Sequence, residues 1–244
     1  MAAKTAKYCV PKESTRMPSL ELLNSRTHAE LRLTRRRDEG RHFAQIVATE
    51  FLLAAPYYPI LFTKRPDTGA FYAGVLMGVE PGQNLHAVDG QLPDYRPADL
   101  ERQGFFVDGD HLVIDREHAV FSDPAGQPLF ERDGEPTDAL RRVQSAIGNL
   151  HQGLEPTDAL IQRFLDYKLL EPIDISLSFD NGETLRLDGL YTVSLDRLHA
   201  LPDASVLTMF RCGDLQLAYA QSASVRHLRT LARRRNDSLV NVPR

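Results

Sequence analysis

The sequence predicts an α+β fold, in which helices pack against mixed or antiparallel sheets built from short strands and hairpins. Residues 173–179 alternate apolar and polar side chains and precede Asn181-Gly182, a pair that favours a tight hairpin turn. Other stretches repeat their apolar residues with the helical period. Hydrophobic residues make up 42% of the 244 residues, which is enough to build a core.

The densest apolar stretch covers residues 43–79. Residues 43–55 are apolar on nearly all sides and predict a buried helix about 20 Å long at 1.5 Å per residue. Pro56 ends this helix because proline has no N–H and its ring clashes with the preceding turn. Residues 58–63 and 71–79 have the composition of strands and flank a turn at 65–69, so a hairpin is expected after the helix.

The stretch from residue 81 to 136 contains many turn signals and predicts short elements. Its turns include Pro81-Gly82 and Asp108-Gly109. The expected elements are a strand at 85–88, one or two helical turns at 97–102, a hairpin of residues 105–107 and 112–114, and a loop from 119 to 136.

A hexapeptide, Glu-Pro-Thr-Asp-Ala-Leu, occurs at residues 135–140 and again at 155–160. In each copy Thr or Asp can accept hydrogen bonds from the free N–H groups that begin a helix. The repeat therefore predicts two helices, at 137–150 and 157–169. Further along, we expect strands at 185–187, 190–193 and 215–220, and helices at 194–201, 202–213 and 222–235.

Charge divides the chain into three predicted parts. Residues 1–42 carry a net charge of +5 and predict a basic, partly irregular N-terminal arm, with residues 30–34 extended. Residues 43–221 carry −14 and form the α+β core, and residues 222–244 carry +5 and form a basic C-terminal helix and tail. An acidic core repels phosphates and no nucleic-acid motif is present, so we expect no nucleic-acid partner.

Cell location is predicted from the absence of long apolar runs. The sequence has no stretch of about 18 apolar residues, and its first residues lack the apolar region of a secretory signal. We therefore expect a cytoplasmic protein with no transmembrane span. Cys9 and Cys212 are too few for a disulfide framework and are expected to be free thiols.

Familiar catalytic and metal-binding motifs are absent from the sequence. It has no G-x-S-x-G, no glycine-rich phosphate loop, no H-E-x-x-H and no C-x-x-C. His111, Asp115 and His118 are the one cluster with metal-like composition, but a strand would separate the first two by about 13 Å. The sequence thus predicts no cofactor, no metal and no catalytic residue.

Five residues are candidates for binding a ligand or a partner: Glu50, Tyr58, Tyr72, Tyr191 and Tyr219. A buried Glu50 would need a fixed partner or a raised pKa, whereas an exposed one would face water or pair with a basic side chain. The tyrosines lie near strand or helix ends, where the ring packs and the hydroxyl can reach a ligand. The alternative for each tyrosine is an ordinary core position.

Several blocks of the sequence resemble the SapC family of bacterial proteins. They are Ala48-Thr49-Glu50-Phe51 through Tyr58-Pro59-Ile60 and Phe62; residues 126–130 and 133–137; residues 169–172 with 181–182 and 187–191; and residues 198–201 through Gly213, Leu215 and Tyr219-Ala220. The sequence departs from the family pattern at Gln221, where a histidine is expected, and at Gln103-Gly104-Phe105.

The resemblance implies a surface-layer-associated protein. It further implies a protein partner, such as a surface-layer component, an outer-membrane TonB-dependent receptor or a halogenase-like protein. We expect a non-enzymatic binding or accessory protein of a surface-layer or outer-membrane uptake system. The alternative is an enzyme, or an obligate subunit of a halogenase- or oxygenase-type enzyme, acting on a peptide or small molecule in a pocket lined by Glu50, Tyr58 and Tyr191.

Overall fold

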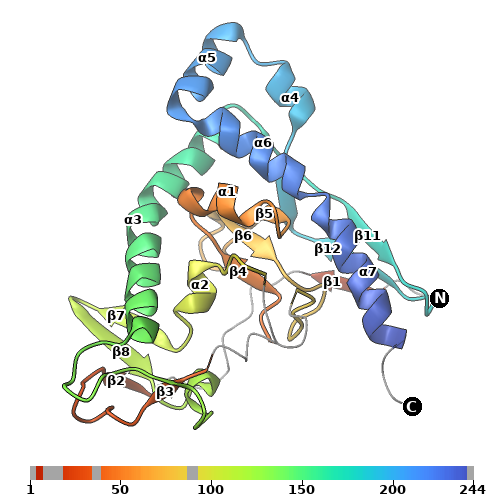
Figure 1. Ribbon diagram of the computed structural model, residues 1–244. Helices are drawn as coiled ribbons and strands as arrows, with labels where there is room; N and C mark the ends of the chain where they lie inside the picture. The colour runs from red at the N-terminus through yellow and green to blue at the C-terminus, as the bar shows by residue number, and fades with distance from the viewer. Residues whose placement is uncertain (1–3, 8–18, 35–39, 87–92, 241–244) are drawn as a thin grey trace.

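The computed structural model describes residues 4–7, 19–34, 40–86 and 93–240, and for residues 4–7 and 240 it describes the backbone alone. Within these residues it confirms the α+β fold (Figure 1). The predicted division into arm, core and C-terminal helix stays a prediction. Cys9 lies outside the described residues.

A five-stranded antiparallel sheet lies at the centre of the fold, with strand order β10-β13-β5-β6-β4. Its inner face buries Ile60 and Phe62 against Phe51 and Phe164. All four side chains are fully buried. The hairpin expected in the apolar stretch is confirmed. The bounds are β4 Phe43–Gln45, β5 Ile60–Lys64, β6 Phe71–Leu76, β10 Leu170–Pro172 and β13 Leu190–Val193.

The predicted helix at residues 43–55 is wrong in its first half. The chain enters as strand β4, which pairs with β6, and then forms the 3₁₀ helix η1 (Ala48–Glu50) and the short helix α1 (Phe51–Ala54). A continuous apolar run fits a strand buried on both faces as well as it fits a buried helix, so periodicity could not separate them. Pairing with β6 satisfies the main-chain groups along that edge of the sheet.

Three smaller sheets surround the central one. The predicted hairpins at 105–114 and 173–187 are confirmed. The predicted strand at 85–88 is wrong where it is described, because Leu85 and His86 lie in a turn. The sheets are β1-β12-β11 (Lys4–Lys7, Thr184–Asp188, Ile175–Ser178), β2-β8-β7 (Leu20–Leu22, His111–Asp115, Phe105–Asp108) and β3-β9 (Arg32–Leu33, Gln127–Pro128). Short helices α2 (Ala98–Glu101) and η2 (Ala119–Phe121) lie in the connections.

Helix α3 (Asp138–Asp166) is one 29-residue helix, and the prediction of two helices here is wrong. It runs along one side of the molecule, from the sheet β2-β8-β7 to the C-terminal helices (Figure 1). A proline inside a helix costs about 3 kcal/mol. The apolar face nevertheless continues past Pro156, since Leu160, Ile161 and Phe164 are buried in the central core. Burial of this apolar face therefore outweighs the helix start that the second copy of the hexapeptide, at residues 155–160, predicts.

The C-terminal part is helical throughout, so the predicted strand at 215–220 is wrong. Gly213 ends α5 with a φ of 81°, and α6 begins at the next residue. The α6 segment then buries Ala218 and Gln221 on one face, with the spacing of a helix. The helices are α4 Leu195–His199, α5 Asp203–Cys212, α6 Asp214–Ser224 and α7 His227–Val240.

Gln221 joins helix α6 to two strands of the central sheet. Its side-chain N–H donates to the carbonyl of Ile60 at 2.7 Å, and its side-chain oxygen accepts from the N–H of Val193 at 2.9 Å. The residue is fully buried. An amide supplies both a donor and an acceptor without carrying charge, so one glutamine can bond to both strands at once.

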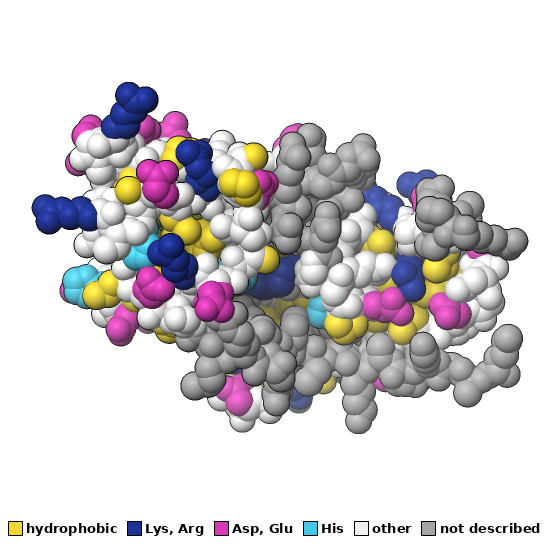
Figure 2. All heavy atoms as spheres, turned by 90° about the horizontal axis from the view of Figure 1, so that it is seen from below, with side chains coloured by type: hydrophobic (Ala, Val, Ile, Leu, Met, Phe, Trp, Pro, Cys, Tyr) yellow, Lys and Arg dark blue, Asp and Glu magenta, His cyan; other side chains and the backbone are white. Residues whose placement is uncertain are grey.

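Two arginines of helix α7 bind to the turn that follows β6. Arg234 donates to the carbonyl of Leu85 at 3.1 Å and to Nδ1 of His86 at 3.0 Å, and Arg235 pairs with Glu80 at 2.9 Å. Figure 2 views the molecule from below, and on this face the described basic side chains lie among acidic and hydrophobic ones. The expected absence of a nucleic-acid partner stays a prediction.

His86 should make the fold sensitive to acid. Burial, followed by the positive charge of Arg234, lowers the pKa of His86 from 6.5 to about 3. In the unfolded chain His86 binds a proton near pH 6.5, whereas in the folded chain it binds one only near pH 3. The unfolding free energy is therefore not reduced by His86 above pH 6.5, and it falls as the pH drops below that value. By pH 4.5 the loss is on the order of 2 kcal/mol. Urea unfolding between pH 7 and 4.5 measures it.

The comparison of two variants isolates this contribution from the titration of carboxylates. His86→Gln should show a shallower fall in unfolding free energy with decreasing pH than the wild type. His151 is exposed, so His151→Gln should follow the wild-type curve. An unchanged pH dependence in His86→Gln would contradict the assignment.

Candidate functional site

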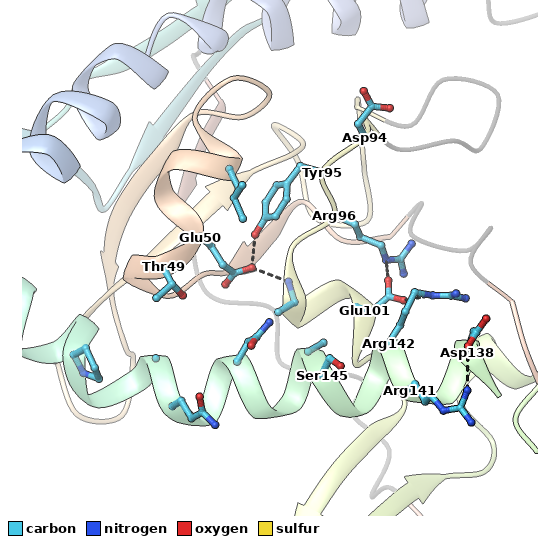
Figure 3. Close-up of a pocket in the computed structure, with 17 residues that line it drawn as sticks. Thr49, Glu50, Asp94, Tyr95, Arg96, Glu101, Asp138, Arg141, Arg142 and Ser145 are labelled. Carbon is cyan, nitrogen blue, oxygen red and sulfur yellow. Dashed lines mark hydrogen bonds and ion pairs between the residues drawn. The ribbon is translucent and has the colours of Figure 1, made fainter. Parts of the chain in front are cut away.

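A pocket of about 950 Å³ lies between helix α3 and the segments that face it, η1 with α1 on one side and residues 94–101 on the other (Figure 3). The α3 wall extends from Asp138 to Pro156. At 1.5 Å per residue, that stretch of helix is about 27 Å long. The pocket is therefore elongated along the helix axis.

The carboxylate of Glu50 fixes the wall opposite α3. One oxygen accepts from the N–H of Val47 at 3.0 Å, and the other accepts from the N–H of Ala98 at 2.9 Å and from the hydroxyl of Tyr95. Glu50 is 6% exposed. The Glu50 side chain thus accepts hydrogen bonds at the start of η1 and at the start of α2, and it orients Tyr95.

Tyr95 is held as a hydrogen-bond donor. Burial, followed by the negative charge of Glu50, raises the pKa of Tyr95 far above its usual range. The hydroxyl therefore stays protonated and bonded to Glu50. Tyr58, fully buried beneath it, donates its own hydroxyl to the carbonyl of Tyr95 at 2.9 Å.

At the floor of the pocket, α3 and η1 approach each other closely. A Cβ atom built on Gly153 would lie 2.5 Å from the side chain of Val47, so glycine is what lets the two segments touch. The hydroxyl of Thr157 donates to the carbonyl of Gly153 at 2.6 Å and accepts from the N–H of Ala48 at 2.7 Å. These contacts hold both walls at a fixed separation.

Ion pairs gather at the end of the pocket where α3 begins (Figure 3). Glu101 lies 2.9 Å from Arg96 and 3.5 Å from Arg142, and Arg141 pairs with Asp138 at 3.2 Å. The charged groups at this end are therefore largely neutralised by one another.

Polar side chains along the middle of the pocket are available to a ligand. Thr49 lies on η1, and Ser145, Asn149 and Gln152 lie on α3; all four are exposed. Among the described residues, none of these four side chains has a hydrogen-bond partner. They can donate to and accept from a bound molecule.

The five residues singled out from the sequence do not form one site. Glu50 lines the pocket, and Tyr58 reaches it through Tyr95. Tyr72 is buried against Phe43, with ring centroids 5.9 Å apart, and Tyr191 packs on Phe71 at 4.8 Å, both on the central sheet. Tyr219 is 44% exposed on α6. Binding roles for these tyrosines stay predictions.

Sequence reasoning missed Tyr95, Asn149 and Gln152. For Tyr95 no sequence signal was available, because its contact with Glu50 spans 45 residues of chain. A signal did exist on α3, since Ser145, Asn149 and Gln152 recur at three- and four-residue spacing and share one flank of the helix. The predicted break before Pro156 hid this pattern.

Three further properties concern the described residues alone. No three His, Cys, Asp or Glu side chains in that part of the chain lie close enough to hold a metal ion. None of its helices combines the length and apolar character needed to cross a membrane. Cys212 is a free, exposed thiol.

A family model matches most of the chain. The model is SapC, and the match covers residues 23–231. No curated protein and no solved structure matches the chain. The resemblance inferred from the sequence is confirmed.

Replacing Glu50 with glutamine should destabilise the fold. Gln keeps the shape of the side chain, but one of the two carboxylate oxygens becomes an NH₂ group, which cannot accept a hydrogen bond. Either the bond from Val47 or the bonds from Ala98 and Tyr95 are then lost. The expected loss of unfolding free energy is about 2–3 kcal/mol, measured by urea unfolding. Glu155→Gln, at an exposed position of α3, should change it by less than about 0.5 kcal/mol. Equal effects of the two variants would contradict the role assigned to Glu50.

Proposed function

Because the chain belongs to the SapC family, we propose that it is a non-enzymatic accessory protein of a bacterial surface-layer or outer-membrane uptake system. It binds a partner protein, and the pocket along α3 is where the partner docks. The partner is a surface-layer component, a TonB-dependent receptor or a halogenase-like protein. A cytoplasmic location stays a prediction, which cell fractionation tests.

One observation carries the docking role of the pocket. Its walls are fixed by internal contacts, while Thr49, Ser145, Asn149 and Gln152 present exposed polar side chains that no described residue engages. Pockets for small molecules are lined mainly by apolar and aromatic side chains with a few polar groups. Most residues that line this pocket are charged or polar, although their apolar atoms contribute the larger part of its surface, and this mixture suits a polypeptide surface.

The enzymatic alternative receives less support from the geometry. A general base needs a free acceptor within reach of a substrate proton. Both carboxylate oxygens of Glu50 already accept hydrogen bonds from the chain, and the hydroxyl of Tyr95 stays protonated. The carboxylate of Asp94 has no partner among the described residues, but it is exposed to water. Turnover of a peptide or small molecule by the purified chain would favour the alternative.

Filling the pocket should abolish capture of the partner. Ser145→Trp places a large ring in the α3 wall, whereas Gln144→Trp places the same ring on an exposed part of the same helix outside the pocket. After cross-linking in the native cell, purification of the tagged chain and mass spectrometry, the wild type and Gln144→Trp should enrich the same protein. Enrichment by Ser145→Trp should fall at least about tenfold, as expected when a docking site is blocked.

Two results would contradict the proposal. Recovery of no specific partner by the wild type would remove the accessory role. Equal capture by both tryptophan variants would move the docking surface away from the pocket. Circular dichroism of each purified variant confirms that loss of capture does not come from unfolding.

A further inference from the structure

Pro156 leaves a main-chain acceptor in the wall of the pocket. In an α-helix the N–H of each residue bonds to the carbonyl four residues earlier, so the residue at 156 would normally bond to Gln152. Proline has no N–H, and the helix nevertheless continues through it. Gln152 and Pro156 both line the pocket. The carbonyl of Gln152 therefore lacks the donor that a helix normally supplies, and both residues are exposed.

Two side-chain amides lie in the same stretch of the α3 wall. Asn149 and Gln152 project from the same flank of α3, with Ser145 one turn before them. Each amide carries both donors and an acceptor, which match the C=O and N–H groups of a peptide bond. Thr49 offers a hydroxyl from the opposite wall (Figure 3).

The dimensions of the pocket fit a short extended peptide. The α3 wall is about 27 Å long. An extended chain advances about 3.3 Å per residue, so about eight residues would fill that length. Leu53, which lines the pocket and is 56% exposed, gives an apolar surface for a peptide side chain.

Charge argues against a strongly anionic occupant. The lining carries four carboxylates, Glu50, Asp94, Glu101 and Asp138, and three guanidiniums, Arg96, Arg141 and Arg142. The difference is one negative charge. The guanidiniums lie within ion-pairing distance of Glu101 or Asp138, whereas Asp94 is exposed and has no partner among the described residues. A peptide that is neutral or carries one basic side chain near Asp94 complements this lining.

We propose that the pocket holds an extended, neutral or weakly basic segment of the partner protein, bound through its main chain to the carbonyl of Gln152 and to the side-chain amides of Asn149 and Gln152. This rests on the proposed function, and it specifies the partner as a flexible strand-like segment. Main-chain recognition of this kind tolerates many side chains and obtains its specificity from a few positions.

A library of random octapeptides displayed on phage and selected on the immobilised full-length chain tests the proposal. Selected sequences are synthesised, and their affinities are measured by fluorescence anisotropy. The expected result is a set of neutral or weakly basic peptides. Their affinity should fall about fivefold to tenfold when a recognised main-chain N–H is replaced by N-methyl, the factor for one lost hydrogen bond.

Pro156→Ala is the most informative variant because the stability of the fold and the affinity for peptides should change in opposite directions. Alanine restores the N–H that bonds to the carbonyl of Gln152, so the midpoint of urea unfolding should rise. Peptide affinity should fall about fivefold to tenfold, since that carbonyl is no longer free. Gln152→Ala and Asn149→Ala should also weaken binding, while Gln144→Ala, on the same helix outside the pocket, should bind as the wild type does.

The outcomes separate this inference from the function on which it rests. If Pro156→Ala is more stable and binds selected peptides unchanged, main-chain recognition at Gln152 is overturned. If no peptide is selected although the wild type captures a partner and Ser145→Trp does not, the partner docks as a folded surface and the inference falls while the function stands. If peptides bind through Gln152 but no partner is captured, the inference stands and the accessory function falls.

Discussion

Glu50 accepts hydrogen bonds from three groups in two segments that lie far apart in the sequence, and the pocket keeps its shape through them. Val47 belongs to the segment after β4, whereas Tyr95 and Ala98 come from the connection that leads into α2. If this carboxylate were removed, buried N–H groups of η1 and α2 would lose their acceptor. On the other side, Gly153 and Thr157 hold α3 against the same segment. Both walls thus depend on residues 47–50.

Much of the fold could be predicted from local patterns, because hairpins and capped helices leave strong signals in sequence. The hairpins of residues 58–79, 105–114 and 173–187 and the helices at 194–201 and 202–213 were predicted in this way. Two of the errors have a common cause, since they occur where tertiary packing decides. Residues 43–45 become a strand because β6 offers an edge, and α3 continues through Pro156 because its apolar face stays buried on both sides of it.

The site was less predictable than the fold. Glu50 could be found because a lone carboxylate in an apolar stretch needs a partner. Its partner Tyr95 could not, because hydrogen bonds between distant residues leave no periodic signal. The polar flank of α3 was visible in the sequence, but its meaning depended on the helix being continuous. The proline that indicated a helix start instead frees an acceptor in the pocket wall.

The most direct measurement of the central claim is site-specific photo-cross-linking in the native cell. A benzophenone amino acid is placed at Ser145, inside the pocket, or at Gln144, on the same helix outside it. We predict that the Ser145 probe forms adducts with one protein and that these map to one short contiguous segment of it, while the Gln144 probe gives few. Adducts of equal yield from both positions, or none from Ser145, would contradict the account.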